Sequence, residues 1–244
     1  TAHAGEIRLD DDTAALLRDR FACEHDGATW VIRDETAAAA GSILPGVRSA
    51  PRFVGRRSEL RALRSVFDDV VRSARARGVL VTGDPGSGKS RLRTEFLGRL
   101  AAEQPELRTF VGQGDAMRSG VPYGVLGGAL ADAMELTPDL PPFERRRRLA
   151  NWLRESARSA DGQHTRAFMG EVVGAPAPDD DDDPLLRAAR QDPRMMAEHI
   201  AVATVNTFRA CLGVPVALVL EDLQWSDASS IQLVDTLLRE LAET

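Results

Sequence analysis

The stretch VLVTGDPGSGKSRLRTEFL, residues 79–97, constrains the fold of this chain more than any other part of its sequence. Residues 83–90 within it match the spacing G-x-x-x-x-G-K-[ST]. An apolar run precedes the match, and a segment with apolar residues at helical spacing follows it. A strand, a glycine-rich turn and a helix in this order predict a loop that binds phosphate through backbone N–H groups and the helix N-terminus.

The chemistry of such a loop gives each position a predicted role. The Lys89 ammonium would reach the β- and γ-phosphates, and the Ser90 hydroxyl would ligate Mg²⁺. Lys89 is the single lysine among 31 basic residues, so a compact cation is used at this point and arginine elsewhere. We therefore expect ATP and Mg²⁺ as cofactors. The other predicted nucleotide-binding positions of the loop are Gly83, Asp84, Pro85, Gly86, Ser87, Gly88 and Arg91.

A second acidic site is expected where the apolar run Ala217–Leu220 ends in Glu221 and Asp222. Ligands of open α/β sheets bind at the carboxyl ends of the strands, so these carboxylates are candidates for catalysis together with Lys89. In the usual pattern the first acid holds the metal and the second polarises the attacking water. This assigns Mg²⁺ to Glu221 and the water to Asp222. The first position is more often Asp, and the two roles could be shared or exchanged.

Composition narrows the function classes. Hydrophobic residues make up 43% of the 244 positions, charged residues 28%, and the net charge is −6, which gives no global support for nucleic-acid binding. The two cysteines, Cys23 and Cys211, have no metal-ligand or disulfide spacing. The apolar run at 214–220 is too short to span a bilayer. We expect a cytoplasmic protein whose partners include no membrane and no nucleic acid contacted directly by this segment.

The pattern of periodicity and turns predicts three parts. Residues 1–33 read as a small α/β element with a hairpin around Asp26-Gly27, a pair suited to a two-residue type I′ turn. Residues 34–50 read as a linker, and residues 51–244 as the main domain. In that domain we expect the following elements: a helix with Leu60, Leu63, Phe67, Val70 and Val71 inward, a buried strand GVLVTG, a helix from Ser90, a strand at 107–114, helices between 123 and 212, a strand PVALVLED and a helix from about Asp227.

Four segments together resemble a known module. FVGR at 53–56, GDPGSGKSRL at 83–92, PYG at 122–124 and LVLEDLQWSD at 218–227 are similar to the AAA-type ATPase module of the STAND class. This module occurs in multidomain bacterial regulators, including LuxR-type activators and proteins that join a kinase or a class III cyclase to an ATPase and TPR repeats. The resemblance covers roughly residues 50–244.

The resemblance implies a three-layer α/β P-loop NTPase with a parallel sheet and a helical insertion. It implies Mg-ATP binding and hydrolysis as a nucleotide-controlled switch in a signalling or transcription-regulatory protein. Val54, Gly55 and Arg56 would contact adenine, although Arg56 could equally be a surface charge at a helix start. The implied partners are the nucleotide, other domains of the same protein (a kinase, cyclase or DNA-binding output, and TPR repeats) and further copies in nucleotide-dependent self-association.

Two alternatives stay open: a nucleotide-binding scaffold with negligible hydrolysis, and a P-loop kinase that acts on a small acceptor. A GTPase is excluded because its N-K-x-D motif would need a second lysine. Residues 1–33 are similar to the segment that closes a cyclase catalytic domain. By the family's strand order, 5-1-4-3-2, the sequence stops before its central strand, so we expect a truncated fragment, incomplete at the C-terminus, in which no ladder joins the strands leading to Lys89 and Glu221.

Overall fold

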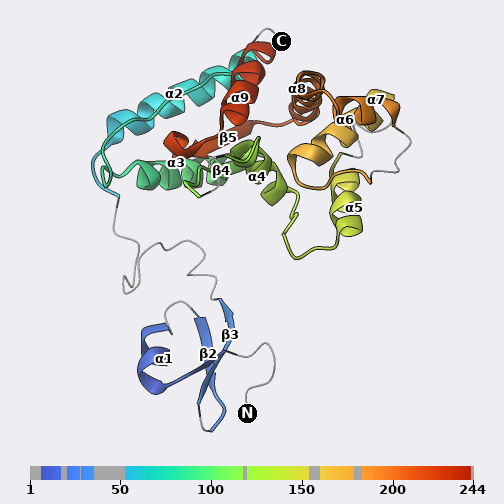
Figure 1. The fold of residues 1–244 in the computed structure, drawn as a ribbon. Helices are drawn as coiled ribbons and strands as arrows, with labels where there is room; N and C mark the ends of the chain where they lie inside the picture. Colours follow the sequence, from blue (N-terminus) through green and yellow to red (C-terminus); the bar gives the residue numbers. More distant parts are fainter. Residues whose placement is uncertain are drawn as a thin grey trace. The chain divides into compact units, whose positions relative to one another are not determined.

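The computed structural model describes residues 7–17, 21–27, 29–35, 53–117, 120–153, 160–178 and 183–242. The chain divides into two compact units, Thr1–Gly55 and Arg56–Thr244. Figure 1 shows the elements of each unit. None of the helices in these described ranges is both long enough and apolar enough to cross a membrane.

The first unit is a small antiparallel sheet with one helix. Its elements are β1 (Arg8–Leu9), α1 (Asp11–Leu17), β2 (Phe21–His25) and β3 (Trp30–Glu35), and the sheet order is β1-β3-β2. Asp10 Oδ1 accepts a hydrogen bond from Thr13 N at 2.7 Å, which caps α1 as its acidic start predicts. The expected small α/β element is confirmed. Strand β3 continues to Glu35, and the remainder of the expected linker lies outside the described residues.

The hairpin loop differs from the predicted two-residue turn. Strand pairing ends at His25 and Trp30, so four residues form the connection. Of the described loop residues, Gly27 has a positive φ (95°) and Asp26 does not, whereas a type I′ turn needs both. The reason lies in the Asp26 side chain, which accepts from Thr29 N at 3.0 Å and pairs with Arg8 at 2.5 Å. These bonds stabilise a longer loop whose two ends are joined by the Asp26 side chain.

The second unit is mixed α/β with a parallel strand pair. Its elements are α2 (Arg57–Ser73), α3 (Lys89–Glu103), β4 (Arg108–Gln113), α4 (Gly124–Ala133), α5 (Pro142–Trp152), α6 (Ala160–Val172), α7 (Pro184–Ala189), α8 (Pro193–Arg209), β5 (Val216–Glu221), a 3₁₀ helix (Leu223–Trp225) and α9 (Ala228–Glu240). Strands β4 and β5 pair in parallel from Arg108↔Val216 to Gln113↔Glu221. The helical segment between them confirms the expected insertion.

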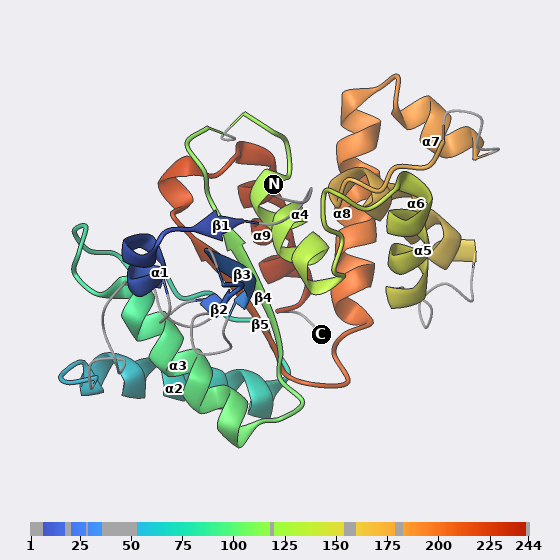
Figure 2. The same ribbon diagram turned by 90° about the horizontal axis from the view of Figure 1, so that it is seen from below.

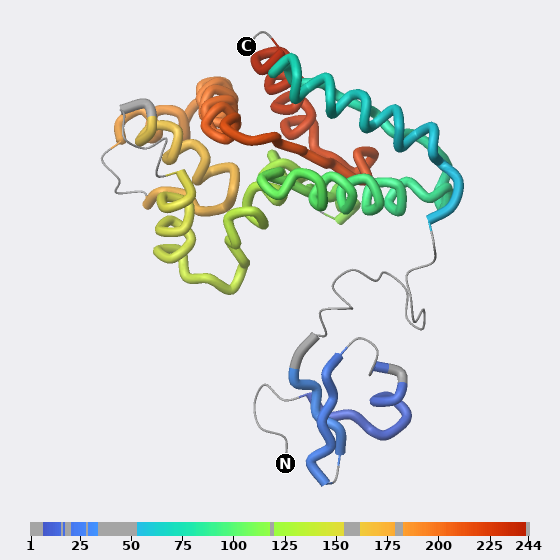
Figure 3. Tube along the Cα trace, turned by 180° about the vertical axis from the view of Figure 1, so that it is seen from behind, coloured from blue at the N-terminus to red at the C-terminus, as the bar shows by residue number. Residues whose placement is uncertain are grey.

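The core of this unit joins the insertion to the sheet. Figures 2 and 3 show α5 to α8 gathered on the side of the unit away from α2 and α3, with α4 next to β4. Phe110 of β4 packs with Phe208 of α8, their ring centroids 5.5 Å apart, in one buried cluster. That cluster also includes Leu126, Leu130, Phe168, Met169, Ile200, Leu233 and Leu237. The apolar side of α4 therefore fixes β4, and through β4 the edge that carries the acidic residues.

The sequence predicts a buried strand at GVLVTG, residues 78–83, and this prediction is wrong. Residues 79–82 have no strand assignment, and Val79, Leu80 and Val81 are 51%, 74% and 44% exposed. In the described part of the chain, β5 pairs with β4 alone. An apolar run becomes a strand only when neighbouring strands satisfy its N–H and C=O groups, and no ladder forms here. The expectation that no ladder joins this segment to the strand of Glu221 agrees with this arrangement.

Candidate functional site

The loop at residues 83–88 leads directly into α3, as its motif predicts. Gly83, Gly86 and Gly88 have φ of 159°, 76° and 87°. The latter two lie in the left-handed region, where a side chain would strain the backbone. A Cβ at either would meet no atom within 4 Å, so the loop faces open space at both points. Helix α3 has no side-chain cap at its N-terminus, which leaves its first turn suited to an anion.

Lys89 folds back over this loop. Its Nζ donates to Gly83 O at 2.8 Å and to Asp84 O at 3.1 Å. The side chain is half-buried, whereas Ser90 is exposed at the start of α3. The ammonium group is thus held at the loop by two carbonyl oxygens, and three donor positions allow it to contact an anion there as well.

Arg56 lies against the same loop. Its guanidinium donates to Ser87 O at 2.6 Å and pairs with Glu59 at 3.2 Å. Arg56 precedes α2 with φ 52°, so it combines the expected helix-start position with a contact to the loop. Val54 is 77% exposed and Gly55 has φ 76°, and both belong to the first unit. Contact of these three residues with adenine stays a prediction.

Glu221 faces α3. Arg93 Nη1 donates to Glu221 Oε2 at 2.5 Å, and the two side chains are 26% and 20% exposed. Arg93 stands four residues after Lys89, one turn along the same helix face. The carboxylate predicted to serve the metal is therefore adjacent to the helix that begins at the phosphate-binding loop.

Asp222 faces the neighbouring strand instead. Gln113 Nε2 at the end of β4 donates to Asp222 Oδ2 at 3.2 Å, and Gln224 Nε2 donates to Oδ1 at 3.3 Å. Asp222 has a positive φ of 52°, which is uncommon outside glycine and often marks functional sites. A Cβ at Gly114 would stand 2.3 Å from Asp222 O, so only glycine permits this close approach. The two acids thus point to different neighbours.

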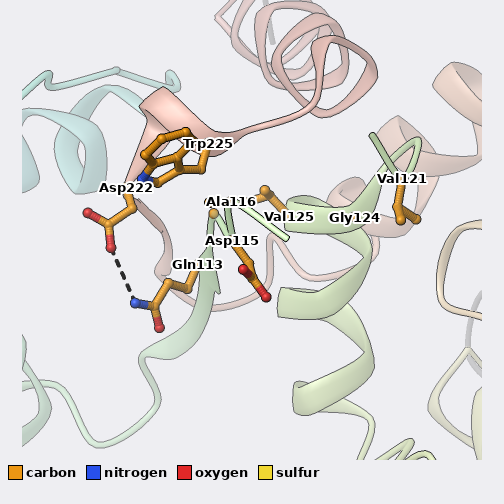
Figure 4. Close-up of a pocket in the computed structure, with 9 residues that line it drawn as sticks. Gln113, Asp115, Ala116, Val121, Gly124, Val125, Asp222 and Trp225 are labelled. Atoms are coloured by element: carbon orange, nitrogen blue, oxygen red, sulfur yellow. Dashed lines mark hydrogen bonds between the residues drawn. The ribbon is translucent and has the colours of Figure 1, made fainter. Parts of the chain in front are cut away.

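A depression of about 560 Å³ lies beside Asp222. Figure 4 shows the Gln113–Asp222 hydrogen bond and the Trp225 ring beside Asp222. The lining residues are Gln113, Gly114, Asp115, Ala116, Val121, Gly124, Val125, Asp222 and Trp225. Of the sequence-predicted site residues Asp222 alone lines it, so the depression is distinct from the loop that holds Lys89. Trp225 is 47% exposed here.

Asp227 connects the start of α4 to the start of α9. Its carboxylate accepts from Ser230 N and Ser230 Oγ, both at 2.7 Å, and from Tyr123 N at 2.8 Å. A longer bond of 3.4 Å comes from Val125 N. Burial raises the pKa of this carboxyl, but the hydrogen bonds outweigh burial and hold its pKa below the ordinary value. Asp227 caps α9, as predicted, and also ties α4 to it.

Two residues of the site were missed by the sequence reasoning. Arg93 carried a detectable signal, because a basic residue one turn after Lys89 shares its helix face. Gln113 carried a weaker one, a polar residue at the carboxyl end of a strand. Their partners stand more than 100 positions away, so only the tertiary structure identifies them.

The residues present fit Mg-ATP. The open glycine loop, the uncapped N-terminus of α3 and the ammonium of Lys89 supply donors for a polyphosphate. The Ser90 hydroxyl and the Glu221 carboxylate are the hard oxygen ligands that Mg²⁺ prefers. Among the described residues, no group of three or more His, Cys, Asp or Glu side chains could hold a metal, so the proposed ligands are one hydroxyl and one carboxylate.

Comparison with known proteins identifies the family of the second unit. The family model described as AAA ATPase domain matches residues 52–243, so the chain belongs to the AAA ATPase domain family. Membership implies a P-loop fold with nucleotide binding and hydrolysis. No curated protein and no solved structure matches the chain.

Proposed function

We propose that this domain binds Mg-ATP at the loop 83–90 and hydrolyses it as a nucleotide-controlled switch in a signalling or transcription-regulatory protein. One observation carries the proposal: the chain's only lysine lies half-buried against its own glycine loop at the start of an uncapped helix. The γ-phosphoryl group would pass to water. When bound, Mg²⁺ would neutralise charge that develops on the phosphate oxygens.

Separate groups of residues would then bind the phosphates, hold the metal and activate the water. Loop N–H groups and Lys89 orient the phosphates, and Ser90 and Glu221 hold the metal. Asp222, positioned by Gln113, orients and polarises the attacking water. Arg56 would contact the adenine end of the nucleotide beside the loop. Catalysis would be positioning and charge stabilisation, which is the usual basis of phosphoryl transfer.

Lys89 permits a direct test. An amine-reactive reagent can acylate only Lys89 and the terminal α-amino group, because no other lysine exists. We expect Mg-ATP to protect Lys89 from acylation, measured by peptide mass spectrometry, while the α-amino group of the same molecules reacts as before. Equal labelling of Lys89 with and without saturating Mg-ATP would contradict the proposed site.

A scaffold that binds nucleotide with negligible hydrolysis is the second candidate. It is favoured by the ion pair at Glu221, since Arg93 occupies Oε2 of the carboxylate that is assigned to the metal. Phosphate release measured beside the protection experiment separates the two functions. Protection with turnover supports the switch, and protection without turnover supports the scaffold.

A further inference from the structure

We propose that Arg93 is an internal competitor of Mg²⁺ for Glu221 and so sets the metal concentration at which the nucleotide site is completed. This inference rests on the proposed function, because it concerns the carboxylate assigned there to the metal. The pair joins α3 to β5 across 128 positions of sequence. It connects the helix of the phosphate-binding loop to the acidic strand end.

The geometry makes the two cations compete for Glu221 Oε2. Arg93 Nη1 lies 2.5 Å from Glu221 Oε2, within direct hydrogen-bond contact. A hard cation that takes this oxygen must displace the guanidinium, because both positive charges cannot share the oxygen without strong repulsion. The pair is only about one quarter exposed, so water screens this repulsion less than at an open surface.

Arg93 is also incompletely bonded, which makes its displacement feasible. In the described structure its Nε is buried without a hydrogen-bond partner. Its Nη2 makes a single 3.4 Å contact with Thr94 Oγ1. A buried donor without a partner is unfavourable, so the guanidinium does not reach its best bonding in this position. The Glu221 contact is the main bond that holds it.

The same contacts connect Arg93 to the metal-ligand candidate on α3. Thr94 Oγ1 donates to Ser90 O at 2.9 Å, and Arg93 Nη2 contacts that same hydroxyl. The backbone carbonyl of Ser90 and the carboxylate of Glu221 are thus linked through Thr94 and Arg93. Displacement of Arg93 would free Glu221 Oε2 and break this chain of contacts. Arg93 is therefore a positioning residue that acts through Glu221.

Arg93→Gln tests the inference, with Arg99→Gln as the matched control. Arg99 lies on the same helix and pairs with Glu95, away from the acidic strand end. A fluorescent ATP analogue is titrated into the full chain at a series of Mg²⁺ concentrations, and in EDTA.

We expect Arg93→Gln to lower the Mg²⁺ concentration at the midpoint of analogue binding roughly three- to tenfold, the scale of one partly screened charge pair. Arg99→Gln and binding in EDTA should remain unchanged. Arg93→Lys keeps a cation in reach and should stay near the wild-type midpoint.

The outcomes separate this inference from the function on which it rests. If all variants bind the analogue and Arg93→Gln has the wild-type Mg²⁺ midpoint, Arg93 is a structural ion pair and the inference is overturned while the proposed function stands. If the wild-type chain binds no analogue, the proposed function fails and the inference fails with it. Melting in EDTA reports folding of each variant, and Arg93→Met, which keeps the apolar stem, replaces Arg93→Gln if the latter unfolds.

Discussion

The last residue of β4 holds the carboxylate that follows β5: Gln113 Nε2 donates to Asp222 Oδ2 at 3.2 Å. Strand register explains the contact, because Gln113 is paired with Glu221, the residue before Asp222. Gly114 N also donates to Glu221 O at 2.9 Å, which extends the ladder to the edge. The orientation of Asp222 therefore depends on β4 as much as on its own strand.

Gln113→Ala should reduce ATP turnover while ATP binding is kept. Without the amide, Asp222 retains only the longer bond from Gln224, so it is less well oriented toward water. Loss of one positioning hydrogen bond would lower the rate roughly tenfold. Phosphate release and analogue titration measure the two quantities. Gln232→Ala, an exposed glutamine on α9, is the matched control and should behave as wild type.

The two acids should be separable by substitution. Asp222→Asn is expected to retain Mg-ATP binding and lose turnover, because the water is no longer polarised. Glu221→Gln should instead shift the Mg²⁺ dependence of binding. The measurements are analogue titration against Mg²⁺ and phosphate release. The reverse pattern would mean that the metal role belongs to Asp222 and the water role to Glu221.

Lys89→Ala should weaken Mg-ATP binding at least tenfold, and Lys89→Arg should fail to restore it. A guanidinium is planar and larger than the ammonium that lies between Gly83 O and Asp84 O. Calorimetric titration with ATP measures the loss, which corresponds to at least about 1.4 kcal/mol of binding free energy. Unchanged affinity in Lys89→Ala would show that the loop at 83–90 is not part of the nucleotide-binding site.

Asp227→Ala should destabilise the domain by about 2–4 kcal/mol, because the N–H groups of Ser230 and Tyr123 would lose their acceptor inside the protein. Urea unfolding measures the difference. Asp235→Ala on the same helix removes an exposed carboxylate paired with Arg239 and should cost no more than about 0.5 kcal/mol. Comparable losses in the two variants would contradict the conclusion that Asp227 stabilises the domain by connecting α4 to α9.

The same carboxyl predicts a pH dependence of unfolding. Its pKa is lower in the folded than in the unfolded chain, so its stabilisation is complete above the unfolded value near 4 and is lost as pH falls through the folded value. We expect the free energy of unfolding to fall as the pH drops below about 4, and to fall less in Asp227→Asn. Equal slopes in both proteins would assign acid sensitivity to other groups.

Local chemistry made much of the site predictable, and tertiary contacts decided the rest. The loop at 83–90 could be read directly, since its spacing, its glycines and the helix after it act within ten residues. The acids stand at the end of the predicted apolar strand PVALVLED, and Asp227 stands at the predicted helix start. Arg93 and Gln113 could not be matched to their partners, because those contacts depend on how α3 and β4 pack against β5. The prediction of a strand at 79–82 was wrong because a strand needs neighbouring strands to bond its N–H and C=O groups. A local apolar pattern does not show whether those neighbours are present.

That exposed segment leads to the last prediction. Val79, Leu80 and Val81 expose apolar side chains, and β5 has one neighbour within the described residues. The family's strand order, 5-1-4-3-2, predicts a further strand between this segment and β5, where neighbouring strands would stand about 4.8 Å apart. A chain extended through that strand should bind ATP more tightly and release phosphate faster than residues 1–244, measured by calorimetry and phosphate release. In the longer chain, Leu80→Asp should remove this gain by placing a charge in the new ladder's apolar face, whereas Val71→Asp on exposed α2 should not. Equal binding and turnover by the short and long chains would show that residues 1–244 already contain a complete catalytic set.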